Sequence, residues 1–229
     1  SNYAGPKKSD GSLAAGGAIH ALASQVSVQD SLIVNGYTTG RGGGISLDPE
    51  ATPSHLEVKG CTIAHNGAEL LGGGIHMSGS NAGPGTSANV ANSILWNNTD
   101  LLGASARSQI RAPVADWVSL EYSILTGWSD VWIPGDGNLD LSPRFAHPNG
   151  PDGEAGTLDD NYALMPSSPA IDAGTNYQVV NEYDLAGAGR VVDDSQTDDT
   201  GQGKAPIVDI GCYEFQPGNA TTPGWRIWV

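Results

Sequence analysis

Two stretches of acidic and amide residues offer oxygen ligands for a metal ion. The first places oxygen-bearing side chains at alternate positions around a glycine, as a calcium-binding loop begins, but His147 stands where an EF-hand needs a carboxylate. We expect a structural calcium ion within residues 134–161, and the alternative is a set of Asx turns and solvated acids. The candidate ligands are Asp136, Asn138, Asp140, Asp152, Asp159 and Asp160.

Three polar residues follow the same glycine-rich phrase at intervals along the chain. His20, Ser46 and His76 each come directly after the phrase Gly-Gly-x-Ile. If these phrases stack, His20 and His76 lie two coils and about 10 Å apart. That separation is too large for one metal ion, but it suits a groove that binds an extended glycan. The alternative is a solvent-facing column without a ligand.

Charged residues near the end of the chain indicate structural roles. Asp184, Arg190 and Asp209 combine an arginine with two carboxylates, which favours an ion pair that stabilises the fold. A substrate-binding arginine is the alternative. The run of residues 193–199 carries four aspartates, and a run of like charges predicts a solvated loop, with metal binding as the alternative.

These candidate residues belong to a repeat. Asn35, Asn66 and Asn97 lie 31 residues apart, and each closes a short phrase rich in aliphatic residues. A fixed period in this range is typical of a solenoid. Short alternating apolar stretches, without a helical apolar stripe, predict strands. The sequence therefore predicts an all-β fold, a parallel β-helix of about four coils.

Stacking of the coils would align equivalent residues into columns, about 4.8 Å apart. The recurring turn position would give a column of asparagines whose amides bond to neighbouring coils. The expected columns are Asn35, Asn66 and Asn97; Leu32, Ile63, Ile94 and Ile124; and Ile19, Ile45 and Ile75.

The repeat divides the chain into two regions. We assign residues 1–133 to the coils and residues 134–229, which are rich in turns, to an irregular cap packed on the last coils. An uncovered solenoid end is an unpaired sheet edge. Residues 1–12 are too few and too polar to cover the other end, so we expect a longer parent β-helix or self-association through the first coil.

Composition excludes several classes of partner. The formal net charge of −15 argues against nucleic acid, whose phosphates need basic residues. No apolar run reaches the roughly 18–20 residues of a membrane span, and the first residues do not resemble a signal peptide. Cys61 and Cys212 form no zinc pattern; they are either a disulfide or two buried thiols.

The C-terminal region carries four motifs in order: Asp160–Leu164, Ser168–Gly174, Asp184–Arg190 and Asp209–Glu214. Together they resemble the C-terminal region of bacterial choice-of-anchor Q domain proteins, and the repeats resemble those of polymorphic outer-membrane proteins. The resemblance implies a right-handed parallel β-helix that is secreted or on the cell surface, and it implies no catalytic residues. The chain departs from the family pattern at Cys212, where alanine is usual, and residues 224–229 match no known anchor.

We therefore expect a non-catalytic domain for adhesion or contact with a polysaccharide or cell-surface glycan. One alternative is a calcium-assisted polysaccharide lyase, because lyases of similar fold use carboxylates on adjacent coils and a basic residue. The outward candidates do not align into one column, and no GxSxG, P-loop or HExxH motif is present. They are Glu57, Lys59, Glu121, Arg107 and Arg111. A structural element of a surface assembly is the other alternative.

Overall fold

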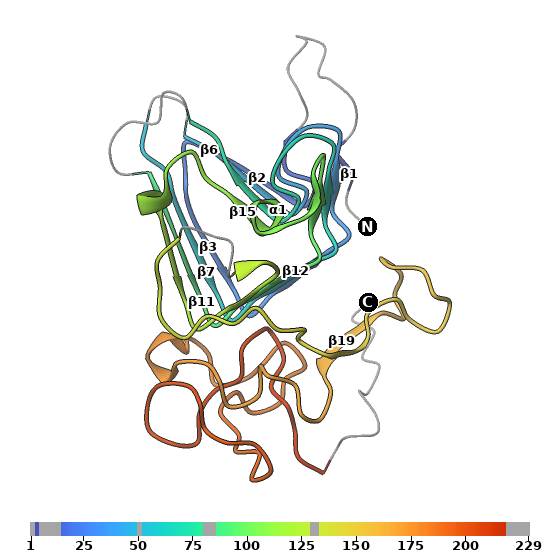
Figure 1. Cartoon of the computed structure of the whole chain (residues 1–229), viewed down its shortest axis with the longest axis vertical. Coiled ribbons are helices and arrows are strands. Elements are labelled where there is room, and N and C mark those ends of the chain that lie inside the picture. Colours follow the sequence, from blue (N-terminus) through green and yellow to red (C-terminus); the bar gives the residue numbers. More distant parts are fainter. Residues whose placement is uncertain (1–2, 5–14, 50–51, 80–85, 129–132, 219–229) are drawn as a thin grey trace.

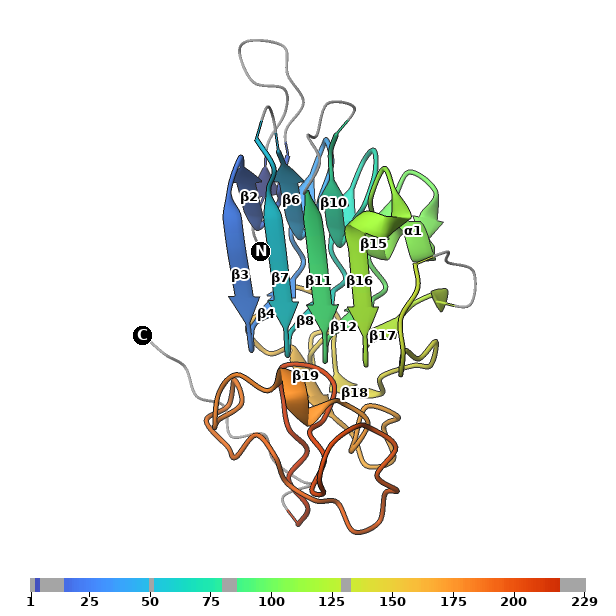
Figure 2. The same ribbon diagram turned by 90° about the vertical axis from the view of Figure 1, so that its left-hand side faces the viewer.

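The chain folds into a solenoid of stacked β-strand coils with an irregular tail. The computed structural model describes residues 3–4, 15–49, 52–79, 86–128 and 133–218. Each of the three main sheets takes one strand from each of four coils, and these strands are parallel (Figure 1). The chain turns counterclockwise in Figure 1 while later coils come nearer the viewer, as the blue-to-green order in Figure 2 shows. The solenoid is therefore right-handed, and the predicted fold class is confirmed.

The strands of each sheet follow one another by one coil. The first sheet contains β2 (Ile19–Leu22), β6 (Ile45–Asp48), β10 (Ile75–Met77) and β15 (Ile110–Arg111). The second contains β3 (Gln25–Gln29), β7 (His55–Lys59), β11 (Ser87–Ala91) and β16 (Val118–Glu121). The third contains β4 (Leu32–Val34), β8 (Thr62–Ala64), β12 (Ile94–Trp96) and β17 (Ile124–Leu125).

Shorter elements close the corners and form the tail. A fourth sheet contains β1 (Tyr3–Ala4), β5 (Tyr37–Thr38), β9 (Gly67–Ala68), β13 (Thr99–Asp100) and β14 (Gly103–Ala104). The remaining elements are α1 (Ala106–Gln109), η1 (Ala115–Trp117), β18 (Phe145–His147), β19 (Asn161–Leu164) and η3 (Asn176–Gln178). No helix in the described residues is long and apolar enough to cross a membrane.

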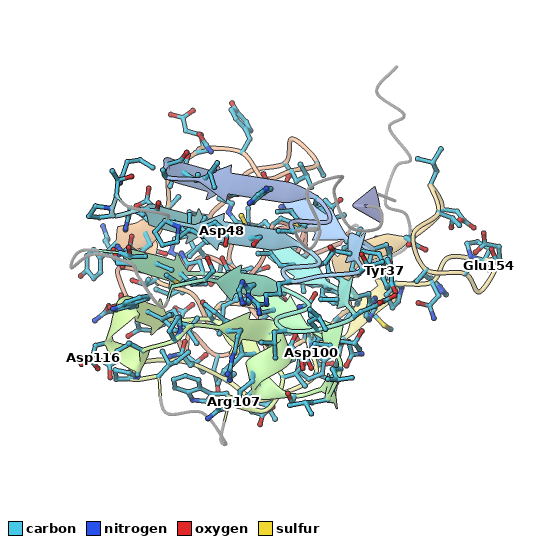
Figure 3. All side chains as sticks on the ribbon, turned by 90° about the horizontal axis from the view of Figure 1, so that it is seen from above. Tyr37, Asp48, Asp100, Arg107, Asp116 and Glu154 are labelled. Atoms are coloured by element: carbon cyan, nitrogen blue, oxygen red, sulfur yellow. The ribbon has the colours of Figure 1, made fainter. Side chains whose placement is uncertain are left out.

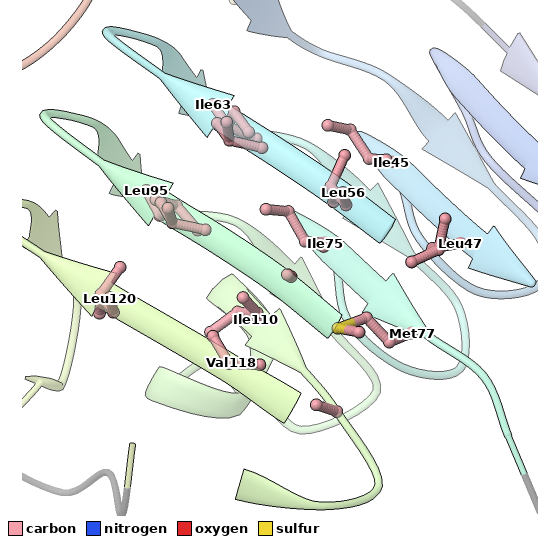
Figure 4. Packing of buried hydrophobic residues seen from close by; sticks show 14 of the residues in the cluster. Ile45, Leu47, Leu56, Ile63, Ile75, Met77, Leu95, Ile110, Val118 and Leu120 are labelled. Carbon is pink, nitrogen blue, oxygen red and sulfur yellow. The ribbon is translucent and has the colours of Figure 1, made fainter. Parts of the chain in front are cut away.

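The interior of the solenoid is a stack of aliphatic columns. Alternation along each strand directs every second side chain inward, so Ile45 and Leu47 of β6 are fully buried in the core (Figure 4). The predicted column of Ile19, Ile45 and Ile75 is confirmed by the strand register, and Ile110 extends it. Equivalent side chains thus pack on each other from coil to coil.

The other predicted aliphatic column is wrong by one residue. Ile63 pairs with Ile33 and Leu95 and faces the core. Leu32 and Ile94 instead pair with Thr62, on the opposite face of the same sheet. Successive coils are offset by 30 and 32 residues, so the constant spacing of 31 matches neither step. A slip of one residue changes the face of a strand to which a side chain belongs.

The predicted asparagine column is wrong for the same reason. Asn35 and Asn97 stack with His65, and all three have left-handed backbone conformations with φ of 55°, 51° and 54°. Asn66 lies one position further on, between Gly36 and Asn98. Asparagine tolerates positive φ better than most residues, which explains its presence at the first of these positions.

A buried amide ladder follows this turn. The Asn66 Oδ1 accepts a hydrogen bond from the Gly36 N–H at 2.8 Å, and the Asn98 Oδ1 accepts one from the Asn66 N–H at 3.0 Å. Each amide nitrogen donates to a carbonyl of the preceding coil, Ile33 O or Ile63 O. Gln109 of α1 continues the ladder by accepting from Asn98. These contacts satisfy backbone groups that the corner leaves without sheet partners.

The tail lies along one flank of the coils. Residues near Leu139 extend the last coil, because the Leu139 N–H bonds to Ser123 O and the Leu125 N–H bonds to Leu139 O. The rest of the tail runs beneath all four strands of the second sheet in Figure 2 and packs on Ile94 and Ile124. The tail therefore contacts more of the solenoid than the last coils to which the sequence assigned it.

Cys61 and Cys212 lie at this flank as free, buried thiols. Burial raises the pKa of each thiol to about 12. The Cys212 N–H donates to the Thr62 hydroxyl at 3.2 Å, so the tail cysteine sits against the coil that carries Cys61.

Candidate functional site

The polar column predicted from the glycine-rich phrases is present on the outer face of the first sheet. His20 pairs with Ser46, and Ser46 pairs with His76, so the three side chains occupy one column; Arg111 is its fourth member. Asp48, which is labelled in Figure 3, lies beside them and binds the His20 Nε2 through its Oδ2 at 2.6 Å.

This column is a poor surface for a ligand. Ser46 is fully buried and His76 is only 4% exposed. Burial lowers the pKa of His76 to about 4, and the positive charge of Arg41 acts in the same direction. His76 is therefore neutral near pH 7. A glycan-binding role for His20, Ser46 and His76 stays a prediction, and the burial favours a structural role.

A hollow on the outer face of the second sheet offers more accessible polar groups. Its volume is about 210 Å³. It lies where strands β7, β11 and β16 meet the tail segment η3. The lining residues are Glu57, Lys59, Asn89, Val90, Ala91, Ser119, Glu121 and Gln178.

Strand register arranges the hollow as two adjacent columns. Glu57, Asn89 and Ser119 are partners in one column. The other column runs from Lys59 through Ala91 to Glu121, and the small alanine leaves space between the two charged residues. These positions all point outward because they alternate with core residues along their strands.

An ion pair sets the electrostatics of the hollow. The Lys59 Nζ lies 2.7 Å from the Glu57 Oε1, and the Ser27 hydroxyl donates to the Glu57 Oε2 at 3.2 Å. The hydrogen bond from Lys59 lowers the pKa of Glu57. Glu57 is therefore ionised at neutral pH and already paired, which makes it a poor general acid.

The carboxyl groups with raised pKa values lie elsewhere, inside the tail. Burial raises the pKa of Asp172 to about 6, of Asp209 to about 7 and of Glu214 to about 9. Asp172 and Asp209 are fully buried, and Glu214 is 4% exposed. A substrate cannot reach these groups, so they perturb the stability of the fold rather than form an active site.

The predicted calcium ligands fall into two separate sets. Asn138 accepts from the Ser123 N–H and donates to Leu120 O, while Asp140 accepts from the Gly127 N–H, so this set bonds to the last coil. Asp136 is exposed there, and its carbonyl bonds to the Tyr122 N–H.

The other set lies in the loop between β18 and β19, on which Glu154 is labelled in Figure 3. Asp152 and Asp159 accept hydrogen bonds within the loop, from Glu154 N–H and Asp152 N–H. Asp160 accepts from the Gly156 N–H, and Gly156 lies against Asn35 of the first coil. Among the described residues no three acidic, histidine or cysteine side chains form a preformed metal site. Calcium within residues 134–161 thus stays a prediction.

Arg190 is buried, and its partners differ from the predicted ones. Its Nε lies 3.5 Å from the Asp30 Oδ1, and its Nη1 lies 3.8 Å from the Glu214 Oε2. Asp184 instead accepts from the Ala188 and Glu214 N–H groups, and Asp209 from the Asp172 and Phe215 N–H groups. The expected pairing of Arg190 with Asp184 and Asp209 is replaced by pairs that the sequence does not suggest.

Three polar residues of the hollow were missed in the sequence: Asn89, Ser119 and Gln178. Asn89 and Ser119 have a detectable signal, because each alternates with the apolar residues of a strand. Gln178 has none, because it comes from an irregular tail segment that only the tertiary structure brings to the sheet. The lyase candidates Arg107 and Arg111 do not line the hollow.

No protein-family model matches the chain, and no curated protein or solved structure shows significant similarity to it. The resemblance to choice-of-anchor Q domain proteins therefore stays a prediction.

Proposed function

We propose that this chain is a non-catalytic, extracellular solenoid domain that binds a glycan on the outer face of β3, β7, β11 and β16. The supporting observation is the hollow of about 210 Å³, to whose lining the tail contributes Gln178. Asn89, Ser119 and Gln178 bring amide and hydroxyl groups to it. Such groups both donate and accept hydrogen bonds, as sugar hydroxyls do.

The shape of this face suits an extended ligand. Four strands spaced by about 4.8 Å extend about 14 Å across the sheet. Polar side chains recur at the same position in each coil along this direction. They are Ser27, Glu57, Asn89 and Ser119. A ligand with repeating polar units would thus meet a repeating set of partners.

The charge of the protein favours a neutral or amine-bearing glycan. The formal net charge is −15, and the Lys59 ammonium in the hollow is already paired with Glu57. A polyanionic glycan would therefore meet electrostatic repulsion. This argues against the alternative of a lyase that acts on uronates. The acidic surface also supports the proposed extracellular location.

The binding test is affinity electrophoresis through gels that contain neutral β-glucan, xylan, chitosan or polygalacturonate. We expect retardation by a neutral or amine-bearing glycan, and weaker retardation for Asn89→Ala and Gln178→Ala. Asn149→Ala is the matched control, because Asn149 is exposed in the tail away from the hollow. Retention that is equal in all four proteins would overturn the proposed site.

Catalysis is tested in the same samples. We expect no new reducing ends and no unsaturated products after long incubation. Release of such products by the wild type, lost in Glu57→Gln or Glu121→Gln, would replace the binding proposal with the enzyme alternative.

Self-assembly is a second candidate function. In the described part of the chain, β2, β3 and β4 are the terminal strands of their sheets, on the first coil. Terminal strands present unpaired N–H and C=O groups that can extend a sheet. Sedimentation velocity over a range of concentrations tests this function, and a monomer throughout would contradict it.

A further inference from the structure

An acidic loop of the tail is closed around a single aspartate. The Asp194 N–H donates to the Asp172 Oδ2 at 3.3 Å. At the other end of the loop, the Thr200 and Gly201 N–H groups donate to the Asp172 carbonyl at 2.9 and 3.1 Å. The segment between these contacts therefore has both ends bound to one residue.

Asp172 has a buried oxygen that the protein does not satisfy. The residue is fully buried, and its Oδ1 has no hydrogen-bond partner. Its backbone is also left-handed, with φ of 52°. A buried carboxylate oxygen without a partner is costly, because it has lost its water and gained nothing in exchange. The Oδ1 atom is therefore open to a partner that carries positive charge.

The charges around Asp172 strengthen this indication. The carboxylates of Asp193, Asp194 and Asp199 are close enough to repel the Asp172 carboxyl group. Within the described residues, none of these four aspartates forms an ion pair. A bound cation would neutralise this group of like charges and satisfy the buried oxygen.

We propose that Asp172 and the loop of residues 193–200 bind one calcium ion, with the Asp172 Oδ1 as the buried ligand. Every donor at the site is oxygen, which suits calcium or magnesium and argues against zinc. A loop with carboxylate and carbonyl oxygens fits the larger and more variable coordination of calcium.

The loop residues have distinct roles at this site. Asp194 holds the shape of the loop, because its carboxylate accepts from the Gln196 N–H at 3.3 Å and the Thr197 hydroxyl at 2.8 Å. Asp193 and Asp199 are exposed at the rim. Their carboxylates do not converge on Asp172 in the structure, so the proposal requires these exposed side chains to rotate toward the ion.

Calcium at this site would stabilise the attachment of the tail. Thr175, three residues after Asp172, exchanges two hydrogen bonds with the Asn92 side chain of a coil, at 2.7 and 2.9 Å. On the other side, the Asp172 N–H donates to the Asp209 Oδ1 at 2.8 Å. An ion that fixes Asp172 therefore acts on the contact between tail and solenoid.

The test uses the whole chain after removal of metals with a chelator. Isothermal titration calorimetry with calcium chloride is expected to show one site, with a dissociation constant on the order of 10⁻⁴ M as in extracellular calcium modules. Calcium is also expected to raise the Tm as its concentration increases, and magnesium to raise it less.

Variants locate the site. Asp193→Asn and Asp199→Asn change exposed side chains and are expected to weaken calcium binding at least tenfold while the proteins still fold. Asp172→Asn is expected to abolish the Tm shift, and it should be more stable than the wild type in chelator. Asp116→Asn, an exposed aspartate in η1, is the matched control and should bind calcium as the wild type does.

Two outcomes would overturn the proposal. One is the absence of heat and of any Tm shift at millimolar calcium, which would mean that a proton compensates Asp172. The other is loss of binding in Asp152→Asn but not in Asp199→Asn, which would place the ion in the loop between β18 and β19. If Asp172→Asn does not fold, the two rim variants decide the result.

Discussion

Arg190 of the tail reaches Asp30 of the first coil, with the Arg190 Nε 3.5 Å from the Asp30 Oδ1. Arg190 is 3% exposed, and its Nη2 donates to the Gly211 carbonyl at 2.5 Å. Arg190 thus connects two segments of the tail to the first coil. Tail residues near Leu139 extend the last coil, at the opposite end of the stack. The tail is held along the solenoid by buried polar contacts as well as by apolar packing.

Replacement of Arg190 tests this connection. Arg190→Met leaves Asp30 without its cation, so we expect the free energy of unfolding to fall by about 3 kcal/mol or more. Urea denaturation measures the change. Arg144→Met, at an exposed tail position, should change stability by less than about 0.5 kcal/mol. Equal small effects of both substitutions would show that the buried pair contributes little.

The two asparagines that follow Trp96 should differ sharply. Asn98 is fully buried and its side chain makes four hydrogen bonds in the amide ladder, whereas Asn97 is exposed at a left-handed turn. We expect Asn98→Ala to cost about 3 kcal/mol, since it leaves buried backbone groups unpaired. Asn97→Ala should cost about 1 kcal/mol, from backbone strain alone. Thermal and urea unfolding of the pair measure the difference, and similar values would contradict a ladder offset by one residue.

Stability should fall as the pH rises above neutrality. Burial raises the pKa of Asp209 to about 7 and of Glu214 to about 9, from ordinary values of 3.8 and 4.5. The folded state therefore retains protons that the unfolded state has lost. The stabilisation they provide is complete below about pH 4 and is lost as the pH rises through the folded pKa values.

The clearest window for this effect lies between pH 7 and 9. Burial lowers the pKa of His65 and His76, so these histidines make the free energy of unfolding rise with pH. That rise opposes the effect of Asp209 and Glu214, and it is complete above about pH 6.5. We expect the free energy of unfolding in chelator to fall by up to about 1.4 kcal/mol per pH unit for each proton released. Glu214→Gln should flatten this dependence. A wild-type profile that is flat or rising from pH 7 to 9 would show that the pair is ionised in the folded state.

The two cysteines should be unreactive until the protein unfolds. Both thiols are buried, and their raised pKa values of about 12 keep the nucleophilic thiolate rare. Thiol titration with Ellman's reagent should detect almost no thiol in the folded protein and two thiols in guanidinium. Recovery of no thiols from the unfolded, unreduced chain would show a disulfide instead.

The register of the coils could be predicted only where a phrase marks the strand itself. Gly-Gly-x-Ile lies at the start of β2, β6 and β10, so it correctly aligned Ile19 with Ile45 and Ile75. The asparagine spacing failed because Asn66 and Asn35 occupy adjacent positions of the turn. At this turn the offset between successive coils changes from 30 to 32 residues, and a constant period cannot represent that variation.

By itself, the sequence determined that this protein is a parallel β-helix with an irregular tail, because repeating apolar strands and glycine corners leave few other ways to bury a core. Only the tertiary structure decided which polar residues meet. The partners of Arg190, the position of Gln178 beside Asn89, and the closure of the acidic loop around Asp172 all join segments far apart in the chain. The physical reason is that local propensity and period act within a coil, whereas an irregular tail is positioned by contacts that have no period.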